Sequence, residues 1–254
     1  MWDRTGRAAA EVIELESAPS TNAVLAERAR AAELPHLTVL LTRHQTAGRG
    51  RLDRVWTAPP GASLAVSVLL RTDGVPFASR GWIPLIAGAA MARAAGAQLP
   101  GHRVGAKWPN DTLVDGRKIC GILAEGTESG VIVGSGINTR MTAEQLPVPT
   151  AASFAALGVD VDEDALLADY LGALDGMLAA LAAAGGDADA AGVRQRVIDS
   201  CVTLGQEVRV MMPEGTDDIV GTAVSLSHEG HLVVAAAEGD VAVSAGDVVH
   251  VRPA

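Results

Sequence analysis

The pattern of the chain changes near Cys201, and this change limits the fold more than any other feature of the sequence. Beyond Gly205, short valine-rich segments alternate with turns at 213–215, 228–230, 238–240 and 246. Short strands separated by regularly spaced turns predict a small all-β barrel. Upstream, apolar strands are mixed with long helical patterns, which indicates an α+β domain. The sequence therefore predicts two domains, residues 1–201 and residues 202–254.

The upstream domain is expected to mix strands and helices along the chain. Strands are predicted at 12–16, 38–42, 63–70, 104–108, 111–114, 118–125 and 131–137. Helices are predicted after Ser20-Thr21-Asn22 and at 82–97, 163–184 and 188–200. A tight Asp115-Gly116 turn should join its two flanking strands. Residues 44–60 carry glycines and prolines without a regular period, which predicts a loop.

Composition limits the class of function. The chain has 254 residues, 48% of them hydrophobic, which suffices for a sizeable core. Its net charge of −10 argues against a general nucleic-acid partner, because an acidic chain repels the phosphate backbone. No apolar run reaches the roughly 20 residues that cross a membrane, and the start lacks an apolar signal core. The two cysteines are far apart and in no metal-binding spacing, which fits a reducing cytoplasm.

Lysine is almost absent from this chain. Arginine outnumbers it 18 to 2, and the two lysines, Lys107 and Lys118, lie eleven residues apart. Lysine is a compact point charge, whereas arginine is a planar fork, so a chain that avoids lysine is expected to keep it where arginine cannot substitute. Asn110, one of only three asparagines, lies between the two lysines. Chance explains any one of these residues, but their clustering indicates a charged binding site.

The first motif is Gln45-Thr46-Ala47-Gly48-Arg49-Gly50-Arg51, followed by Arg54 and Trp56. Glycines on both sides of Arg49 let the backbone turn sharply and approach a ligand. Residues 43–54 contain four arginines and one aspartate, which suits an anion held by backbone N–H groups and guanidinium forks. The motif is neither a dinucleotide fingerprint nor a Walker loop. A solvated basic hairpin is the alternative interpretation.

The second motif, residues 105–111, places Lys107, Asn110 and Asp111 around a Trp-Pro pair. The Trp-Pro pair forms a rigid apolar wall from which the polar groups can converge. Asp111 could help hold Mg²⁺ between phosphate oxygens. Antiparallel pairing after the predicted hairpin could return Lys118 to the same pocket. The alternative is a strand that ends in an ordinary Pro-Asn turn.

Two shorter motifs complete the set. Ser20-Thr21-Asn22 places hydroxyl and amide groups at a helix start, where plain capping is the alternative. In Gly134-Ser135-Gly136-Ile137-Asn138, glycines could let the end of a strand approach a ligand. Each of these two motifs is weak alone.

Taken in order, these motifs resemble the catalytic core of biotin–protein ligases over about residues 15 to 140. The quoted segments are S-T-N, Q-T-A-G-R-G-R with a downstream W, K-W-P-N-D, G-R-K-I-C-G-I-L and G-x-G-I-N. The resemblance implies an α+β fold with a class II aminoacyl-tRNA synthetase-like mixed sheet and a small SH3-like C-terminal β-barrel. One departure stands out. The family loop usually reads G-R-G-R-x-G-R-x-W, and Asp53 occupies its third glycine position. An acid there is expected to weaken phosphate binding or to restrict loop closure.

The same resemblance implies a reaction and its residues. Biotin and ATP would form biotinyl-5′-AMP, and the biotinyl group would pass to a lysine of a biotin carboxyl carrier protein or domain. The implied catalytic residues are Lys118, Arg51, Lys107 and Asp111, with Asp111 as the candidate Mg²⁺ ligand. The implied biotin ligands are Ser20, Thr21, Asn22, Gln45, Gly48, Arg49, Gly50, Arg51 and Lys118. The implied ATP ligands are Arg49, Arg51, Arg54, Trp56, Lys107, Asn110, Lys118 and Asn138.

Three other functions stay open at this point. A lipoate–protein ligase is related, although the Gly-Arg-Gly-Arg loop and Lys-Trp-Pro-Asn-Asp favour biotin. A biotin sensor or repressor would need a DNA-binding element such as the N-terminal helix-turn-helix of some family members. The core motifs here begin within the first 20 residues, so we expect no such element. An inactive biotin binder is the third, because of Asp53.

Overall fold

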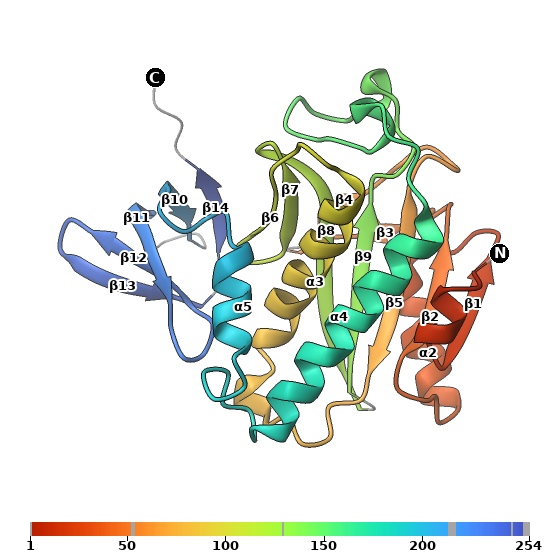
Figure 1. The fold of residues 1–254 in the computed structure, drawn as a ribbon, viewed down its shortest axis with the longest axis horizontal. Coiled ribbons are helices and arrows are strands. Elements are labelled where there is room, and N and C mark those ends of the chain that lie inside the picture. Colours follow the sequence, from red (N-terminus) through yellow and green to blue (C-terminus); the bar gives the residue numbers. More distant parts are fainter. Residues whose placement is uncertain (1, 52–53, 129, 213–216, 245, 251–254) are drawn as a thin grey trace.

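The structure is a computed structural model that describes residues 2–51, 54–128, 130–212, 217–244 and 246–250. Asp53, the departure from the ligase pattern, lies outside the described residues. The α+β fold class predicted from the sequence is confirmed. A seven-stranded sheet with helices on both faces carries most of the chain, and a five-stranded sheet forms its C-terminal part (Figure 1).

The large sheet is mixed, with the strand order β1-β2-β5-β9-β8-β7-β6. Strands β1 (Glu11–Leu15) and β2 (Thr38–Thr42) pair in parallel, and every other neighbouring pair is antiparallel. The remaining strands are β5 (Leu64–Leu70), β6 (Val104–Lys107), β7 (Asp111–Val114), β8 (Arg117–Thr127) and β9 (Gly130–Ile137). Strand β2 is buried on both faces, which explains its unbroken apolar run.

Helices bury the two faces of this sheet separately. Figure 1 shows α3 (Trp82–Gln98), α4 (Glu163–Ala183) and α5 (Val193–Ser200) in front of the sheet, and α2 (Thr21–Ala31) behind it. Side chains alternate along a strand, so Val39 joins the main core while the next residue, Leu40, joins a smaller core under α2. A short helix, α1 (Thr5–Ala8), packs at the start of α4.

Helix α4 is long and apolar enough, by length and composition, to cross a membrane, and among the described residues no other helix meets that test. Its apolar side chains are nevertheless used in the core. Leu166, Leu167, Leu171, Leu174 and Leu181 are at most 1% exposed. These leucines recur on one side of α4 and pack it against the rest of the fold, as in a core helix of a folded domain.

The C-terminal sheet is antiparallel throughout, with the strand order β13-β12-β11-β10-β14. Its strands are β10 (Glu207–Met211), β11 (Ile219–Leu226), β12 (Leu232–Ala236), β13 (Gly239–Val243) and β14 (Asp247–His250). The entering chain is attached to the edge strand β6. The N–H of Val202 donates to Ala106 O at 2.9 Å, and the N–H of Trp108 donates to Thr203 Oγ1 at 3.0 Å. These bonds fix the small sheet beside the end of the large one that carries both lysines.

Most predicted elements are found within a residue or two of their expected bounds. The Asp115-Gly116 hairpin is confirmed: both residues have positive φ, 48° and 75°, and Val114 pairs with Arg117. The last helix of the large domain was expected from 188, and this start is wrong. Helix α5 begins at Val193, because Gly192 adopts a left-handed φ of 64° directly before it. The predicted loop 44–60 contains a small hairpin of β3 (Gly48–Arg49) and β4 (Val55–Trp56).

Candidate active site

The first part of the site arises where β1 and β2 end. Their parallel pairing continues into the following loops, since Ala18 N donates to His44 O at 3.0 Å and Thr46 N donates to Ala18 O at 2.9 Å. This places Gln45 beside the first turn of α2. Thr21 donates to Gln45 Oε1 from its backbone N at 2.7 Å and from its hydroxyl at 3.0 Å. Two distant motifs thereby form one uncharged polar surface.

Asn22 connects that surface to the rest of the sheet. Its Oδ1 accepts from the Ser67 hydroxyl at 2.6 Å, and its Nδ2 donates to Leu123 O at 3.2 Å and to Glu125 Oε2 at 2.7 Å. The residue is 5% exposed. Every polar group of its side chain therefore has a protein partner, as buried amides require. Ser20 caps α2, its hydroxyl accepting from Ala23 N at 3.4 Å.

Glycines on β9 and in the hairpin make room for these side chains. A Cβ at Gly134 would lie 2.4 Å from Asn22 Oδ1, and one at Gly136 would lie 2.7 Å from the Trp56 ring. A Cβ at Gly48 would lie 2.4 Å from Trp56 O. The sequence suggested that the Gly134-Ser135-Gly136 motif admits a ligand. In the structure these glycines admit the side chains of Asn22 and Trp56.

The second part of the site is cationic and is assembled by two hairpins. Pairing of β6 with β7 sets Lys107 opposite Asp111. The two-residue turn after β7 brings Lys118 back, so that its Nζ lies 2.6 Å from Asp111 Oδ1. A Cβ at Gly121 would come within 3.0 Å of that Nζ, so glycine there leaves the lysine its place. The sequence prediction that Lys118 returns to the same pocket thus agrees with this geometry.

Burial makes this part of the site a strong electrostatic environment. Burial lowers the pKa of Lys107, and the nearby positive charges of Lys118 and Arg54 add to that effect while Asp111 opposes it. Burial also lowers the pKa of Arg51. Cations held in low dielectric interact strongly with an anion that enters beside them. The buried thiol of Cys120 has its pKa raised to about 12 by burial, so it is no nucleophile here.

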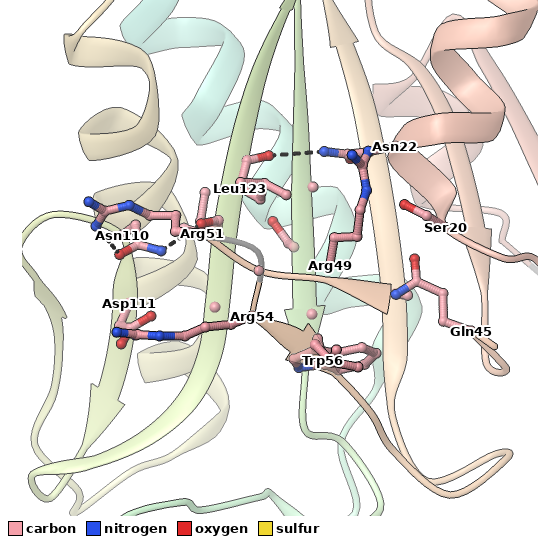
Figure 2. Close-up of a pocket in the computed structure, with 18 of the residues that line it drawn as sticks. Ser20, Asn22, Gln45, Arg49, Arg51, Arg54, Trp56, Asn110, Asp111 and Leu123 are labelled. Carbon is pink, nitrogen blue, oxygen red and sulfur yellow. Dashed lines mark hydrogen bonds between the residues drawn. The ribbon is translucent and has the colours of Figure 1, made fainter. Parts of the chain in front are cut away.

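The β3–β4 hairpin crosses in front of the site (Figure 2). Arg51 donates from Nη1 to Asn110 Oδ1 at 3.0 Å and from Nη2 to Gly246 O at 3.3 Å. Arg54 forms an ion pair with Asp247 of the C-terminal sheet. Arg49 lies 3.1 Å from Glu125 on β8. The three arginines therefore bridge the hairpin to three separate parts of the molecule.

These parts enclose one cavity. It is lined by Ser20, Thr21, Asn22, Gln45, Arg49, Gly50, Arg51, Arg54, Val55, Trp56, Ala65, Asn110, Asp111, Lys118, Gly121, Ile122, Leu123, Gly134, Ser135, Gly136 and Asp247. Figure 2 shows the uncharged groups Ser20 and Gln45 at one end and Asp111 with Asn110 at the other. Most predicted site residues line this cavity.

Three predicted site residues lie just outside the lining. Gly48 sits under Gln45 and Trp56, in the hairpin. Lys107 lies behind the lining, on β6 opposite Asp111. Asn138 is buried, and its Nδ2 donates to Ala152 O at 2.9 Å, so its amide fixes the chain after β9.

Sequence reasoning missed several lining residues. Leu123 gives the cavity an apolar side chain, and it lies in a strand whose apolar pattern has no feature that marks a ligand. Glu125, which is not among the lining residues, holds both Asn22 and Arg49. Asp247 arrives from the other sheet, about 190 residues along the chain from the hairpin it contacts. Only the fold reveals such a contact.

The described residues contain no group of three or more His, Cys, Asp or Glu side chains arranged to hold a metal ion. The two carboxylates that line the cavity are each paired with a cation, Asp111 with Lys118 and Asp247 with Arg54. Magnesium usually binds through one or two carboxylates together with substrate phosphates and water. Asp111 fits that mode, as a single protein ligand to an ion carried by a nucleotide.

The mixed sheet, the bipolar cavity and the covering Gly-Arg hairpin define a class of ligase, and the chain belongs to the Biotin/lipoate A/B protein ligase family. The sequence model of that family matches residues 14–141. The model named Biotin protein ligase C terminal domain matches residues 203–251. The first match covers the motifs that form the cavity, and the second covers the sheet that supplies Asp247.

Named relatives agree with this membership. The biotin–[acetyl-CoA-carboxylase] ligase of Mycobacterium tuberculosis is 38% identical over 236 residues, which is 92% of this chain and 86% of that protein. The bifunctional ligase/repressor BirA of Escherichia coli is 33% identical over 59% of this chain and 47% of its own length. The biotin protein ligase of Aquifex aeolicus in complex with biotin and ATP has a TM-score of 0.77 and 26% identity, covering 96% of this chain and 100% of that one.

Proposed function

We propose that this chain is an ATP-dependent biotin–protein ligase. It joins biotin to AMP and then transfers the biotinyl group to a lysine of a biotin carboxyl carrier protein or domain. The observation that carries the proposal is that one cavity has uncharged polar groups at one end, the cationic site at the other and the apolar Leu123 side chain between them (Figure 2). These environments correspond to a ureido head, a carboxylate facing phosphates and an aliphatic chain. The named relatives give no support to lipoate as the substrate.

The uncharged end is the proposed site of the biotin head. A buried, neutral ureido group needs hydrogen-bond donors and acceptors rather than charges. Ser20, Thr21 and Gln45 supply them from elements that are already hydrogen-bonded to each other. Asn22 positions this end through Ser67 and the β8 backbone. Gly48, Arg49 and Gly50 would close over the head as part of the hairpin.

The cationic end is the proposed site of adenylate formation. A carboxylate oxygen of biotin attacks the α-phosphorus of ATP, the bond from that phosphorus to the β-phosphate oxygen breaks, and pyrophosphate leaves. Two anions must approach, so fixed positive charge lowers the barrier. Lys118 would exchange Asp111 for the carboxylate and the α-phosphate. Arg51 and the buried Lys107 would neutralise phosphate oxygens.

The rest of the nucleotide is assigned to the residues around the hairpin. Arg49, Arg54 and Trp56 are proposed to contact ATP from the hairpin, Asn110 and Lys118 from the floor, and Asn138 from the end of β9. We propose that Mg²⁺ enters with ATP and that Asp111 is its protein ligand. The ion would draw charge from the phosphate oxygens, while Lys118 remains the group that meets the carboxylate.

In the second step, the neutral amine of the acceptor lysine attacks the mixed anhydride carbonyl. An amide forms, AMP leaves and the amine loses a proton. The hairpin should exclude water until the acceptor arrives, because hydrolysis competes for the same carbonyl. We propose that residues 1–201 carry this chemistry and that residues 202–254 complete the cavity wall. Two free cysteines, Cys120 and Cys201, suit action in the cytoplasm.

The test is direct. The chain is incubated with biotin, ATP, Mg²⁺ and a carboxyl carrier domain, and the carrier is weighed by mass spectrometry. We expect one added biotinyl group, on one lysine, that depends on ATP. A carrier with arginine at that lysine is the control and should stay unmodified. Parallel reactions with lipoate in place of biotin should give no product. A carrier that remains unmodified with biotin would contradict the proposal.

A further inference from the structure

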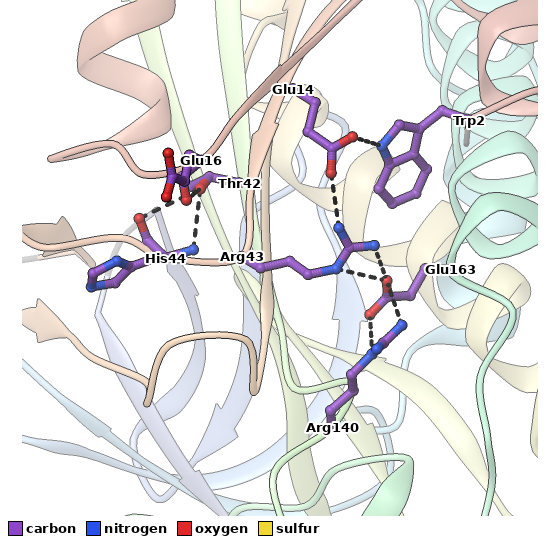
Figure 3. A network of polar contacts seen from close by, with 8 residues as sticks. All are labelled: Trp2, Glu14, Glu16, Thr42, Arg43, His44, Arg140 and Glu163. Atoms are coloured by element: carbon purple, nitrogen blue, oxygen red, sulfur yellow. Dashed lines mark hydrogen bonds and ion pairs between the residues drawn. The ribbon is translucent and has the colours of Figure 1, made fainter.

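A network of four charged side chains lies outside the cavity, at the start of α4 (Figure 3). We call Glu14, Arg43, Arg140 and Glu163 the Glu163 cluster. Glu163 accepts from Arg43 at 2.6 Å and 3.2 Å and from Arg140 at 3.1 Å and 3.2 Å. Arg43 also donates to Glu14 at 2.8 Å. Two carboxylates thus balance two guanidinium groups.

Glu163 is the buried centre of this cluster. Its side chain is 4% exposed, whereas that of Arg140 is 54% exposed. It is also the first residue of α4, where the helix dipole favours a negative charge. Burial alone would lower the pKa of Arg43, but its bonds to Glu163 and Glu14 outweigh that effect and raise it. Losing one buried partner would leave the other charges uncompensated.

The two arginines of the cluster are attached by their backbones to the segment that covers the cavity. The carbonyl of Arg43 accepts from Gly61 N at 2.9 Å, and the N–H of Arg140 donates to Ala62 O at 2.9 Å. This segment, residues 44–62, begins directly after Arg43 and ends with residues 61–62. The start of segment 44–62 therefore adjoins Arg43 in the chain, and its end is hydrogen-bonded to Arg43 and Arg140, whose guanidinium groups share one carboxylate.

Between those ends, the described part of segment 44–62 is held by contacts of unequal strength. Gln45 and Arg51 are hydrogen-bonded to Thr21 and Asn110. The β3–β4 hairpin, in contrast, has two residues in each strand, and the side chains of Arg49 and Arg54 are 51% and 60% exposed in their ion pairs. Exposed ion pairs contribute little stability. The resting position of the hairpin therefore depends on the ends of the segment as well as on these contacts.

We propose that Glu163 is a positioning residue for the ligase reaction. Through Arg43 and Arg140 it fixes both ends of segment 44–62, and so determines how firmly that segment retains the acyl-adenylate. Glu163 does not line the cavity and touches no reacting group. This inference rests on the proposed function. It adds that a carboxylate on α4, outside the cavity, controls how firmly the intermediate is retained.

The experiment measures coupling rather than speed. With saturating acceptor, AMP released is compared with acceptor biotinylated, using the full chain with biotin, ATP and Mg²⁺. An adenylate that escapes and hydrolyses gives AMP without product. A variant that is only partly folded loses both products equally, so its ratio stays at the wild-type value. For Glu163→Gln we expect the uncoupled AMP to rise roughly tenfold, the change that about 1.4 kcal/mol of barrier produces.

Asp164→Asn is the matched control. Asp164 lies one residue further on α4 and accepts from Thr5 N at 2.8 Å and Arg4 N at 2.9 Å, and it has no hydrogen bond or ion pair to the described residues of segment 44–62. Its loss should lower the melting temperature and leave the coupling ratio unchanged. A wild-type ratio in folded Glu163→Gln would overturn the inference, as would an equal rise in Asp164→Asn.

Arg140→Gln keeps the inference testable if Glu163→Gln does not fold. Its half-exposed side chain can be lost while Glu163 keeps Arg43, so the variant should fold and show a smaller rise in uncoupled AMP. An unchanged ratio there would also overturn the inference. The two proposals fail differently. If the wild-type chain forms neither AMP nor biotinylated acceptor, the proposed function is wrong. If it forms both and the variants stay coupled, only the role of Glu163 is wrong.

Discussion

The two ends of the cavity are built in opposite ways. At the uncharged end, Ser20, Thr21 and Asn22 are 6%, 3% and 5% exposed. Ser20 caps its own helix, and Thr21 and Asn22 are hydrogen-bonded to neighbouring elements. At the cationic end, the Lys118 and Arg54 side chains are 43% and 60% exposed and are held by ion pairs. The first end is already organised for its ligand. At the second end, Lys118 and Arg54 must give up their ion pairs with Asp111 and Asp247 before they can bind phosphates.

This difference predicts that the two ends respond differently to substitution. Changes at the organised end should alter binding of biotin together with stability, since the same hydrogen bonds serve both. Changes at the cationic end should alter reaction rate or retention with little effect on stability, since exposed ion pairs contribute little to folding.

The largest effect is expected for Lys118→Ala. Removing the cation proposed to meet both the carboxylate and the α-phosphate should slow adenylate formation by about 10²–10³. The melting temperature should stay near the wild-type value. Pyrophosphate release measures the rate, and Arg117→Ala, which removes a charge from the neighbouring position of β8, is the control. Wild-type turnover in Lys118→Ala would show that the cationic end acts through another group.

Gly134→Ala tests the organised end. The added Cβ would lie 2.4 Å from Asn22 Oδ1, so the amide must move and lose its bonds. Each buried polar group left without a partner costs about 1–3 kcal/mol. We expect the KM for biotin to rise by roughly tenfold or more and the melting temperature to fall with it. Gly126→Ala, on the paired strand β8 and with open space around its Cβ, is the control. Equal behaviour of the two variants would remove the distinction between the ends.

Arg51→Gly tests how the hairpin is held. The variant loses the bond to Asn110 and the bond to Gly246 O, which is one of the links between the hairpin and the C-terminal part of the chain. We expect biotinyl-adenylate to escape and label lysines of an unrelated bystander protein, detected by streptavidin blotting. Wild-type chain at equal adenylate output is the comparison. Labelling that stays confined to the carrier would mean that Arg51 serves the first step alone.

The smallest effect is a change in pH dependence. Burial lowers the pKa of Lys107, so this lysine loses its charge as pH rises through a value below the ordinary lysine range. Adenylate formation should therefore decline on the alkaline side. Lys107→Arg should remove the alkaline decline, because arginine stays protonated. The pH profiles of kcat/KM for ATP are compared between the wild type and Lys107→Arg. If both show the same alkaline decline, Lys107 is not its source.

The sequence predicted the helices and strands of the site better than the contacts between them. The return of Lys118 to Asp111 could be foreseen, because a two-residue Asp115-Gly116 turn leaves one geometry for the paired strands. The meeting of Thr21 with Gln45 came only from the family resemblance, since parallel strands leave no such short-range signal. The contacts of Asp247 and Glu163 could not be foreseen, because carboxylates far along the chain reveal a partner only when the chain is folded.

Glycine positions show the same limit. Gly134 and Gly136 were expected near a ligand, and they line the cavity, but their missing Cβ atoms make space for the side chains of Asn22 and Trp56. A glycine in the sequence can indicate that another group lies close to the backbone, but it does not identify that group. The helix start at 193 was missed for a related reason: the left-handed turn at Gly192 depends on how the preceding residues pack.

The amide of Gln45 has a consequence for inhibitor chemistry. Its oxygen accepts two hydrogen bonds from Thr21, which leaves the NH₂ as the group free to face an incoming molecule. Thr21, rather than the bound molecule, thus determines that Gln45 offers hydrogen-bond donors at this position. An analogue that offers a lone pair there is complemented, and one that offers an N–H meets two donors and loses affinity. Discrimination between such isosteres should weaken only in part in Thr21→Val, because the hydroxyl bond is lost while the backbone N–H of residue 21 still donates to the amide oxygen.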